Sequence, residues 1–467
     1  MSLPLKVSLW YFVCMLVSKG IALFTTPLFT RILSTSEYGL VSVYSSWQSF
    51  LGIFITFGLA NSVFNVGLVK FDKDKNNFNS SMIGLLFISF FVSSLIIMIS
   101  YGVLRELFQL DFKYMVAILL TSFFLCLQNM WLLRKRMEYD YRRMTILTLV
   151  CCFAQVILSV FFVLFASDKA FAKVLGASVV IVLLGTYCFI QITRNNYHFF
   201  DKKYWIFAIK YNFPMLPHFL AGVILNQVDR VMIQKMVGLD EAGIYTVAYS
   251  GAMVIYMINN ALYASYNPWL LKRLKEKNYD KIDKIVNYIM FIYLFPLLTL
   301  IVFAPEIMNI IAPIEYHDGI YVIPPVACSM FFILLFNLFA PVEHFSLKTK
   351  FLGGASIIAA IVNIILNYIF IQYWGYLAAG YTTLVCYILY AFAHWCYMKI
   401  SCKQIVGNNI FNDRVIVLLS LIVILISLVS TLSYRYIMVR YCFFIAIIFL
   451  IALKFKNIKN VLYELKG

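Results

Sequence analysis

Charged residues are scarce in this sequence. Only 13% of its 467 residues are charged and 63% are hydrophobic, and the mean hydropathy is +0.87. A soluble domain carries about 25% charged residues, because its surface faces water. This chain has too few charged groups to cover a soluble surface, so we predict an integral membrane protein.

The motifs of soluble catalytic sites are also missing. The sequence contains no G-x-x-x-x-G-K-[ST] segment, which excludes ATP binding through a P-loop. None of the ten cysteines forms a C-x-x-C pair, so no zinc or redox site of that type is expected, and most of them lie in apolar segments. The loops between these segments reach at most about twenty residues, too few for a catalytic domain.

A series of apolar segments fills most of the chain. Fourteen of them are long enough to span a bilayer, which takes about 20 residues of helix. The first runs to Leu33 and is too long for the core of a signal peptide, so we expect it to remain as the first span. The segments begin near residues 7, 39, 82, 114, 144, 171, 207, 243, 285, 320, 352, 376, 414 and 435.

Lysine and arginine are divided unequally between alternate loops. Of the 38 basic residues, 28 lie in tails and loops on one side of the predicted membrane and eight, Lys173 among them, lie in loops on the other. Loops rich in lysine and arginine stay in the cytoplasm. We therefore place both termini in the cytoplasm, and we attribute the net charge of +17 to topology and not to a nucleic-acid partner.

The sequence repeats itself weakly at an offset of 204 residues. Glu37-Tyr-Gly-Leu-Val-Ser-Val is echoed by Glu241-Ala-Gly-Ile-Tyr-Thr-Val, and Leu175-Gly-Ala-Ser by Ala379-Gly-Tyr-Thr. Each copy holds six spans, an even number, so both copies enter the membrane in the same direction. The predicted fold is all-α, with two parallel six-helix repeats as lobes around a central cavity. The lobes are residues 1–200 and 201–400, and two extra helices and a tail occupy 401–467.

The seventh predicted span is unusually polar. His218, Asn226 and Asp229 lie on one face of a helix, and Arg230 and Gln234 lie on an adjacent face. A charge at membrane depth costs a few kcal/mol, so it faces a bundle interior or a watery cavity. Asp229 and Arg230 are about 100° apart around the helix and do not face each other. Asp229 therefore either anchors a cation of a neighbouring helix or takes part in transport and ion coupling.

The first predicted span carries a lysine at depth. Lys19 lies near its middle, too far from either interface for easy snorkelling, and shares a helical face with Thr26 and Thr30. We expect this face to line a cavity. Arg31 lies near the outer end of the span, where snorkelling explains it as well as a role in binding does.

Other polar residues recur at helical spacing inside the spans. Asn61 and Asn65 fall one turn apart in the second span and predict a polar stripe there. Asn129 lies in the fourth span. Single amides of this kind commonly join helices by hydrogen bonds, which is the simpler interpretation of each. Glu343 and His344 end the tenth span near its inner face, where we expect wet interface residues.

Three stretches of the sequence point to one family. They are S-K-G-I-A-L-F-T-T-P-L-F-T-R-I-L-S-T-S-E-Y-G-L near the N-terminus, P-x-x-P…D-R-x-M-I…G-x-x-E/D-A-G-I-Y-T-x-A-Y in the middle, and N-I-I-L-N…G-Y-L-A-A-G-Y-T-T further on. Together they resemble the Wzx-type polysaccharide flippases of the multidrug/oligosaccharidyl-lipid/polysaccharide exporter superfamily. The resemblance implies that the chain translocates an undecaprenyl-pyrophosphate-linked oligosaccharide across the bacterial cytoplasmic membrane. By position, Lys19, Arg31 and Arg230 are then the cavity cations for the anionic substrate.

The resemblance also implies partners and alternatives. The partners are the lipid bilayer, the lipid-linked oligosaccharide of O-antigen, capsule or another surface polysaccharide, and the polysaccharide polymerase with its chain-length machinery. No cofactor is expected, and H⁺ and Na⁺ are the candidate coupling ions. The alternatives are a peptidoglycan lipid-precursor flippase, a drug/cation antiporter of the same superfamily and a membrane polysaccharide polymerase. Deep positive charges argue against the antiporter, and short outer loops argue against the polymerase.

Overall fold

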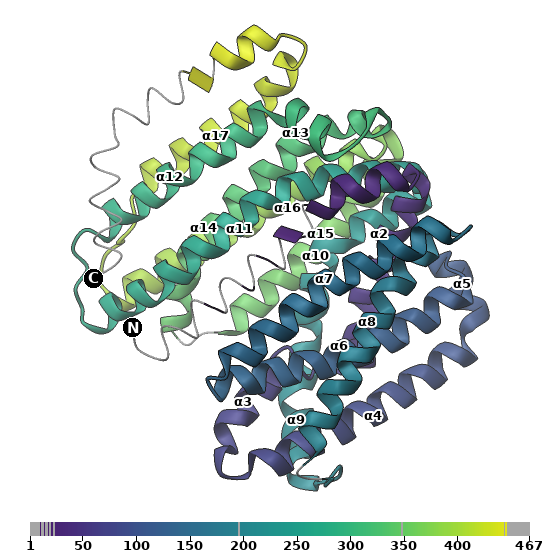
Figure 1. Cartoon of the computed structure of the whole chain (residues 1–467). Helices are drawn as coiled ribbons and strands as arrows, with labels where there is room; N and C mark the ends of the chain where they lie inside the picture. The colour runs from purple at the N-terminus through teal and green to yellow at the C-terminus, as the bar shows by residue number, and fades with distance from the viewer. Residues whose placement is uncertain are drawn as a thin grey trace. The chain divides into compact units, whose positions relative to one another are not determined.

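The structure is a computed structural model that describes residues 10, 14, 17, 20–21, 24–194, 197–346, 349–442 and 444–445, without the side chains of 349–352. All regular secondary structure in these residues is helical (Figure 1), which confirms the predicted all-α fold. The chain forms two compact units, Met1–Gln234 (unit 1) and Lys235–Gly467 (unit 2). Unit 1 thus includes most of the seventh predicted span, which the sequence repeat assigns to the second lobe. The repeat boundary at residue 200 stays a prediction.

The helices of unit 1 follow one another with short connections. Residues 24–32 are helical ahead of the first labelled helix. The helices are α2 (Thr35–Ile55), α3 (Val63–Lys70), α4 (Lys75–Ile99), α5 (Tyr101–Phe108), α6 (Phe112–Met137), α7 (Tyr141–Phe165), α8 (Lys169–Thr193), α9 (Lys202–Asn212) and α10 (Leu216–Met236), with 3₁₀ turns η1 (Asp72–Asp74) and η2 (Phe213–Met215).

Polar residues fix where several of these helices begin. At the start of α2, Ser34 Oγ accepts a hydrogen bond from the Glu37 N–H, and the Glu37 carboxylate accepts one from the Ser34 N–H at 2.8 Å. This reciprocal capping box satisfies two of the N–H groups that the first turn of a helix leaves unpaired. Asp140 and Asp168 cap α7 and α8 with one such bond each.

The helices of unit 2 follow the same order. They are α11 (Leu239–Lys275), α12 (Ile282–Val302), α13 (Ala304–Ile311), α14 (Ile323–Phe345), α15 (Thr349–Trp374), α16 (Leu377–Ile405) and α17 (Asp413–Ser433), with the 3₁₀ helix η3 (Ile314–Tyr321) before α14. Residues 437–442 are helical after α17.

The duplication visible in the sequence recurs in the helices. α2 begins at Thr35 and α11 at Leu239, which is the offset of 204 residues. The eight-residue helix α5 follows α4 as the eight-residue helix α13 follows α12. In unit 1, α8 packs against α6 and α7, and in unit 2, α16 packs against α14 and α15. The two units are therefore repeats of one arrangement of helices.

Nine helices of the described chain are long and apolar enough to cross a membrane, which makes this a multi-pass membrane protein. α2, α10 and α11 are also long enough but carry more polar or charged residues, and α2 and α10 both contribute to the polar pocket described below. The first and last predicted spans are described only in part.

The second predicted span is broken. α2 and α3 are separated by a turn in which Phe57 and Gly58 have φ angles of 50° and 59°, in the left-handed region. The prediction that Asn61 and Asn65 lie one turn apart on one helix is therefore wrong. Asn61 lies in the turn, Asn65 lies in α3, and both are exposed. The corresponding part of α11 is helical throughout, so this break belongs to unit 1 alone.

Residues from the far end of unit 1 stabilise the break. Asn212, which is fully buried, donates a hydrogen bond from Nδ2 to the Phe57 carbonyl oxygen at 2.7 Å. The ring of Phe219 lies so close to Gly58 that a Cβ atom there would come within 3.1 Å of it. A broken helix is tolerated at membrane depth only where other groups bond the freed backbone, as Asn212 does here.

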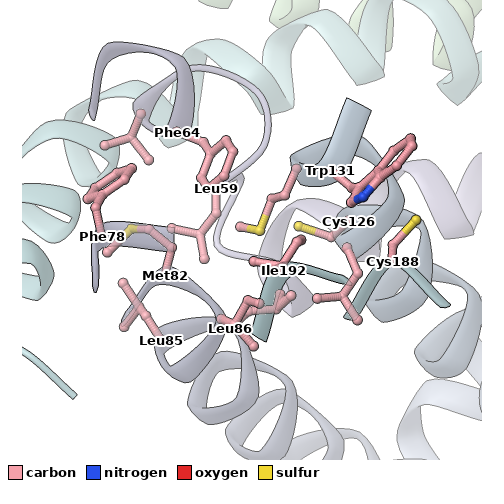
Figure 2. Close-up of a cluster of buried hydrophobic side chains, with 14 of the residues drawn as sticks. Leu59, Phe64, Phe78, Met82, Leu85, Leu86, Cys126, Trp131, Cys188 and Ile192 are labelled. Atoms are coloured by element: carbon pink, nitrogen blue, oxygen red, sulfur yellow. The ribbon is translucent and has the colours of Figure 1, made fainter. Parts of the chain in front are cut away.

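A buried apolar cluster lies against the break. Figure 2 shows Leu59 and Phe64 from the break and α3 beside Phe78, Met82 and Leu86 of α4. The Phe64 and Phe78 rings have centroids 5.8 Å apart. Lipid tails are as apolar as these side chains, so the cluster holds the helices together mainly through close van der Waals packing.

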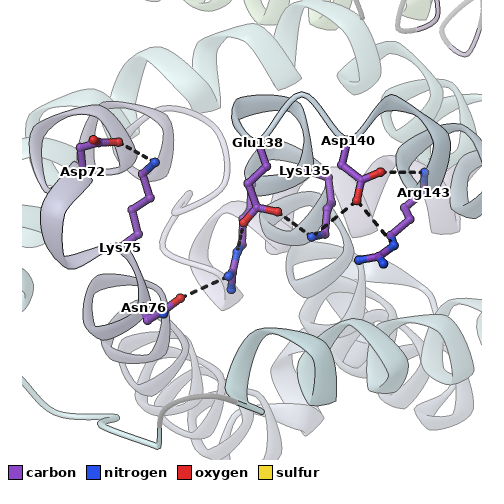
Figure 3. Close-up of polar contacts among 8 residues, drawn as sticks. Asp72, Lys75, Asn76, Lys135, Glu138, Asp140 and Arg143 are labelled. Carbon is purple, nitrogen blue, oxygen red and sulfur yellow. Dashed lines mark hydrogen bonds and ion pairs between the residues drawn. The ribbon is translucent and has the colours of Figure 1, made fainter.

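Charged side chains form a network at one end of unit 1 (Figure 3). Arg134 and Lys135, near the end of α6, contact Glu138 at 2.7 and 2.6 Å, and Arg134 also donates to Asn76 of α4 at 3.2 Å. Burial alone would raise the pKa of Glu138. The hydrogen bonds from Lys135 and Arg134 outweigh burial and hold this pKa below its ordinary value. The network therefore stays charged at neutral pH and ties the α6–α7 turn to α4.

The close contact of α7 and α8 gives a stability prediction. Gly176 on α8 faces the α7 backbone, and a Cβ atom there would lie 2.5 Å from Ser159 N and Cα. Gly176→Ala therefore forces the helices apart, and we expect a loss of about 1–3 kcal/mol. The measurement is the thermal unfolding midpoint of the purified protein in detergent.

Two glycines serve as references for this measurement. Gly380, the counterpart of Gly176 at the 204-residue offset, leaves 3.2 Å to the Pro325 ring, so Gly380→Ala should cost less. No atom of the described residues lies within 4 Å of the position that an added methyl group would take at Gly353 in α15, so Gly353→Ala should be neutral or slightly stabilising. Equal midpoints for Gly176→Ala and Gly353→Ala would contradict the prediction.

Candidate functional site

A polar pocket of about 550 Å³ lies within unit 1 beside the break between α2 and α3. It is lined by α2, the break itself, α6 and the first half of α10. No aspartate, glutamate, lysine or arginine of the described chain lines it. Its polar lining residues are Gln48, Ser49, Thr56, Asn61, Ser122, Asn129, His218 and Asn226. We call it the unit 1 pocket.

Several side chains of the unit 1 pocket are held in place by other protein groups. Gln48 Nε2 donates to Thr121 Oγ1 at 2.7 Å, and Asn226 Nδ2 donates to the Gly222 carbonyl oxygen at 2.7 Å. Gly52 brings α2 close to α6, because a Cβ atom there would touch Ser122 Oγ at 3.4 Å. The pocket wall is thus preorganised by contacts between and within its helices.

Two buried polar atoms of the pocket residues have no protein partner. Ser122 Oγ and His218 Nδ1 make no hydrogen bond to the described residues. A buried polar atom left unpaired costs about 1–3 kcal/mol, so such atoms favour a polar ligand or water beside them. The unit 1 pocket is therefore suited to a neutral molecule with many hydrogen-bonding groups.

Part of this lining was visible in the sequence. His218 and Asn226 were predicted to face a bundle interior or a watery cavity, and Asn61 to belong to a polar stripe, and the structure brings all three to one pocket. Asn129 was expected to join helices, but it is exposed and lines the pocket instead. Gln48 has no sequence signal, because a single amide in an apolar span does not reveal which way it faces. The role of these residues in binding stays a prediction.

Arg230 lies one helical turn beyond Asn226 on α10. It is 7% exposed, and its Nη1 donates to the Asn226 carbonyl oxygen at 2.6 Å. It also interacts electrostatically with the hydroxyl of Tyr38 on α2, which is hydrogen-bonded to the Thr26 side chain. Thr26 and Arg230, two of the residues predicted to line a cavity, thus both act on the Tyr38 hydroxyl.

A second cation reaches the same tyrosine. The Lys173 ammonium on α8 lies 4.2 Å from the centroid of the Phe29 ring and 4.4 Å from that of Tyr38. Cation–π contacts at such distances are worth up to about 2 kcal/mol when water is excluded. The assignment of Lys173 to an outer loop is wrong, because α8 begins before it at Lys169. We call Thr26, Phe29, Tyr38, Lys173 and Arg230 the Tyr38 cluster.

Thr30 and Arg31 do not line the unit 1 pocket. Thr30 is buried and its hydroxyl donates to the Pro27 carbonyl oxygen at 3.3 Å. Arg31 is exposed, and its Nη1 donates to the same oxygen at 2.7 Å, so its head group turns back along its own helix. Lys19 lies outside the described residues.

Asp229 and Gln234 complete the predicted set on α10. Asp229 is fully buried and Gln234 is 7% exposed, and neither lines the unit 1 pocket. Asp229 therefore shares a helical face with His218 and Asn226 without reaching the same space. Its part in helix pairing or ion coupling stays a prediction.

Unit 2 also buries polar side chains. Asn367 Nδ2 donates to Asn363 Oδ1 at 3.3 Å within α15, and the Thr382 hydroxyl of α16 donates to Asn367. Glu343 on α14 lies 2.8 Å from His394 on α16, and both are fully buried. The expectation that Glu343 is a wet interface residue is wrong, because α11, α12, α16 and α17 surround α14.

The chain resembles a known protein family in sequence and solved structures in fold. The model of the family described as polysaccharide biosynthesis protein matches residues 5–272. No curated protein matches the chain in sequence. Among solved structures, the lipid II flippase MurJ in an inward closed conformation has a TM-score of 0.73 at 16% identity, covering 96% of this chain and 99% of that one.

Multidrug transporters share the fold as well. A multidrug resistance MATE family transporter of the MOP superfamily, in its inward-facing conformation, has a TM-score of 0.62 at 14% identity over 85% of this chain and 95% of that one. A multidrug resistance MATE family transporter in an outward-facing conformation has a TM-score of 0.52 at 14% identity, covering 87% of this chain and 97% of that one. The TM-scores show that the fold is shared, and at such low identities these structures show nothing beyond the fold. The family match spans more than half of the sequence and confirms the resemblance to the Wzx-type flippases. The chain therefore belongs to the polysaccharide biosynthesis protein family.

Proposed function

We propose that this chain moves an undecaprenyl-pyrophosphate-linked oligosaccharide from the inner to the outer leaflet of the bacterial cytoplasmic membrane, by alternating access of its two lobes. The family and the fold are those of membrane transporters. The choice of an oligosaccharide for surface polysaccharide, such as O-antigen or capsule, rests on one observation, the uncharged polar lining of the unit 1 pocket.

The chemistry of a sugar chain suits this pocket. Each sugar hydroxyl that loses water without gaining a partner costs several kcal/mol in hydrocarbon, so an oligosaccharide does not cross a bilayer unaided. Asparagine and glutamine side chains both donate and accept hydrogen bonds, as sugar hydroxyls do. Gln48, Asn61, Asn129 and Asn226 supply such groups, and Ser122 and His218 supply unpaired ones. A cationic drug would instead need a carboxylate, and none from the described chain lines the pocket.

The pyrophosphate of the substrate needs fixed positive charge, and Arg230 of the Tyr38 cluster carries one. Lys173 lies over the Tyr38 ring and Arg230 interacts electrostatically with the Tyr38 hydroxyl, and an arginine binds phosphate oxygens through two parallel N–H groups. We propose that Arg230 and Lys173 bind the pyrophosphate, together with Lys19 and Arg31 of the first predicted span. With the cell interior negative, moving two negative charges outward gains about 4–5 kcal/mol per 100 mV, so export does not require ion coupling.

A peptidoglycan lipid precursor is the alternative substrate. The fold shared with the lipid II flippase MurJ over 96% of this chain favours it. Both substrates carry a pyrophosphate on a long lipid, so the cations do not separate them. The two substrates differ in the sugar-bearing head group, so identification of this head group in cells decides between them.

Deletion of the gene in its own host tests the substrate. We expect surface polysaccharide to disappear and lipid-linked oligosaccharide to accumulate on the inner leaflet, while peptidoglycan synthesis continues. The measurement is mass spectrometry of extracted polyprenyl-linked intermediates, with restoration by the plasmid-borne gene as the control. Accumulation of the peptidoglycan precursor with normal surface polysaccharide would overturn the proposal in favour of the alternative.

Replacement of the Tyr38 cluster cations tests the pyrophosphate site. We expect Arg230→Ala and Lys173→Ala each to lower surface polysaccharide at least about tenfold, which corresponds to about 1.4 kcal/mol of lost binding. Arg230→Lys should retain more activity than Arg230→Ala, because it keeps the charge and loses only the paired N–H groups.

The matched control for these variants is Arg105→Ala. Arg105 lies exposed on α5, 4.0 Å from Asp111, and belongs to no pocket described above. All variants are compared at equal amounts in the membrane. Full polysaccharide display by both Arg230→Ala and Lys173→Ala would refute the assigned role of the cluster.

Thiol labelling tests whether the unit 1 pocket holds water. In a variant with its native cysteines replaced, Asn129→Cys should react with a small charged methanethiosulfonate at least about tenfold faster than Ile157→Cys, because thiolates form only in contact with water. Ile157 is 65% exposed on the apolar surface of α7 and serves as the control. Equal labelling rates would mean that the pocket is dry.

A further inference from the structure

The short helix α9 carries apolar side chains on its exposed side. Its 11 residues rise only about 16 Å, which is too short to span a bilayer. Tyr204 and Ala208 are buried, whereas Ile206 and Ile209 on the opposite side and Phe213 just after the helix are 41%, 43% and 65% exposed. The last three follow one another at the spacing of one helical face. We call Ile206, Ile209 and Phe213 the apolar face of α9.

Side-chain hydrogen bonds hold α9 in one orientation against the rest of unit 1. The helix packs against α3 and α4 (Figure 1), and the Tyr204 hydroxyl donates to the Asp74 carboxylate just before α4. Trp205 Nε1 donates to the Ser81 carbonyl oxygen at 2.9 Å, and Asn212, the last residue of α9, bonds the break between α2 and α3. The apolar face therefore stays turned away from the core of unit 1.

The contact with Ser81 sets the depth of α9 in the membrane. Ser81 lies six residues after the start of α4, or about 9 Å along a helix that is long and apolar enough to cross the membrane. The head-group layer of a bilayer is about 5–7 Å thick on each side. We therefore place α9 at the level of the head groups, on the side where the excess of lysine and arginine in the loops predicts the cytoplasm.

Two lysine side chains contact one aromatic ring beside α9. Lys70 at the end of α3 and Lys203 in the first turn of α9 have their Nζ atoms 5.7 and 5.2 Å from the centroid of the Phe71 ring. Lys70 Nζ also lies 4.6 Å from the centroid of the Phe207 ring on α9. Lys210 follows Lys203 by two helical turns and shares its face. We call Lys70, Lys203 and Lys210 the lysine edge.

The carboxylates that adjoin the lysine edge in sequence are bonded to other groups. Asp72 pairs with Lys75 at 2.5 Å, Asp74 accepts from Tyr204, and Asp201 accepts a backbone N–H of the first turn of α9 at 2.8 Å. The ion pairs within the described residues do not involve the lysine edge. Two ammonium groups at one ring repel each other, so an anion between them is stabilised. The exposed lysine edge therefore favours an anionic ligand.

We propose that α9 and the end of α3 form a binding site for an anionic phospholipid of the cytoplasmic leaflet, with the phosphate at the lysine edge and the acyl chains along the apolar face. Lys210 follows Ile206 by one helical turn, so the two surfaces adjoin as the head group and the chains of a lipid do. A helix with an apolar face and flanking lysines lies in the membrane interface in this way. The cytoplasmic leaflet is negatively charged, and each lysine near it strengthens binding about fivefold.

The combination of the two surfaces selects a lipid as the ligand. A free phosphate ion or an acidic protein would satisfy the charge of the lysine edge and leave the apolar face in water. A phospholipid covers both surfaces at once, and it is present at the depth where α9 lies. This site takes part in no step of the proposed sugar transport, and its failure would leave that proposal untouched.

Quenching by brominated lipids tests the site in the full-length protein. In a variant with its native cysteines replaced, Ile209→Cys is labelled with the fluorophore bimane and reconstituted in phosphatidylcholine vesicles with a minor share of phosphatidylglycerol. One lipid at a time carries bromine on its acyl chains, which quenches the label on contact. We expect phosphatidylglycerol to be enriched at the label at least about threefold above its share of the bilayer. The same label on Ile157→Cys, on the exposed apolar surface of α7, should report the bulk share.

Removal of the lysine edge should abolish this enrichment. In the variant Lys70→Gln/Lys203→Gln/Lys210→Gln we expect phosphatidylglycerol at the label to fall to its bulk share, while quenching by phosphatidylcholine persists because the apolar face is unchanged. The matched control removes the same charge from three exposed lysines at the end of α11, also predicted to be cytoplasmic, and should keep the enrichment. This control is Lys272→Gln/Lys275→Gln/Lys277→Gln.

Three outcomes overturn the proposal. No quenching by either brominated lipid would show that the apolar face of α9 lies in water. Quenching by both lipids in proportion to their bulk shares would show contact with the bilayer without selection of an anionic head group. Enrichment that persists in the lysine-edge variant, or that is lost to the same extent in the α11 control, would show that the lysine edge is not what attracts the lipid.

Discussion

The structure depends on one constraint, the absence of water around most of its backbone. A carbonyl group freed inside a membrane-spanning bundle must be bonded by the protein itself. The hydrogen bond from Asn212 to the Phe57 carbonyl meets that requirement at the break between α2 and α3. Because the break is satisfied there, the chain can turn at membrane depth, and the unit 1 pocket lies where it turns.

The residues proposed to bind the sugar and those proposed to bind the pyrophosphate are connected through one helix of unit 1. Asn226 lines the uncharged pocket, and Arg230 one turn further along α10 belongs to the Tyr38 cluster. A substrate with a neutral sugar head and an acidic linker has the same division along its length. Since both residues are on one helix, a displacement of α10 would move the proposed sugar-binding and phosphate-binding groups together.

The apolar pattern was sufficient to predict the all-α fold and the duplication. A span in lipid must form its backbone hydrogen bonds internally, which favours a helix, and such spans are recognised from hydropathy. Depth alone also indicated His218, Asn226 and Arg230 as interior residues. The break could not be predicted, because its partners, Asn212 and Phe219, lie more than a hundred residues away in sequence. Lys173 and Glu343 were misplaced for the same reason: their surroundings come from other helices.

The duplicated halves differ most where α2 and α3 correspond to the single helix α11. A helix of 37 residues is about 55 Å long, well beyond the roughly 30 Å of the hydrocarbon layer. α11 also carries its proline, Pro268, close to its C-terminal end. Most of α11 is thus one continuous helix, whereas its counterpart is divided into α2 and α3 by a turn. We therefore expect unit 1 to bend at the break between α2 and α3, and α11 of unit 2 to tilt as a whole.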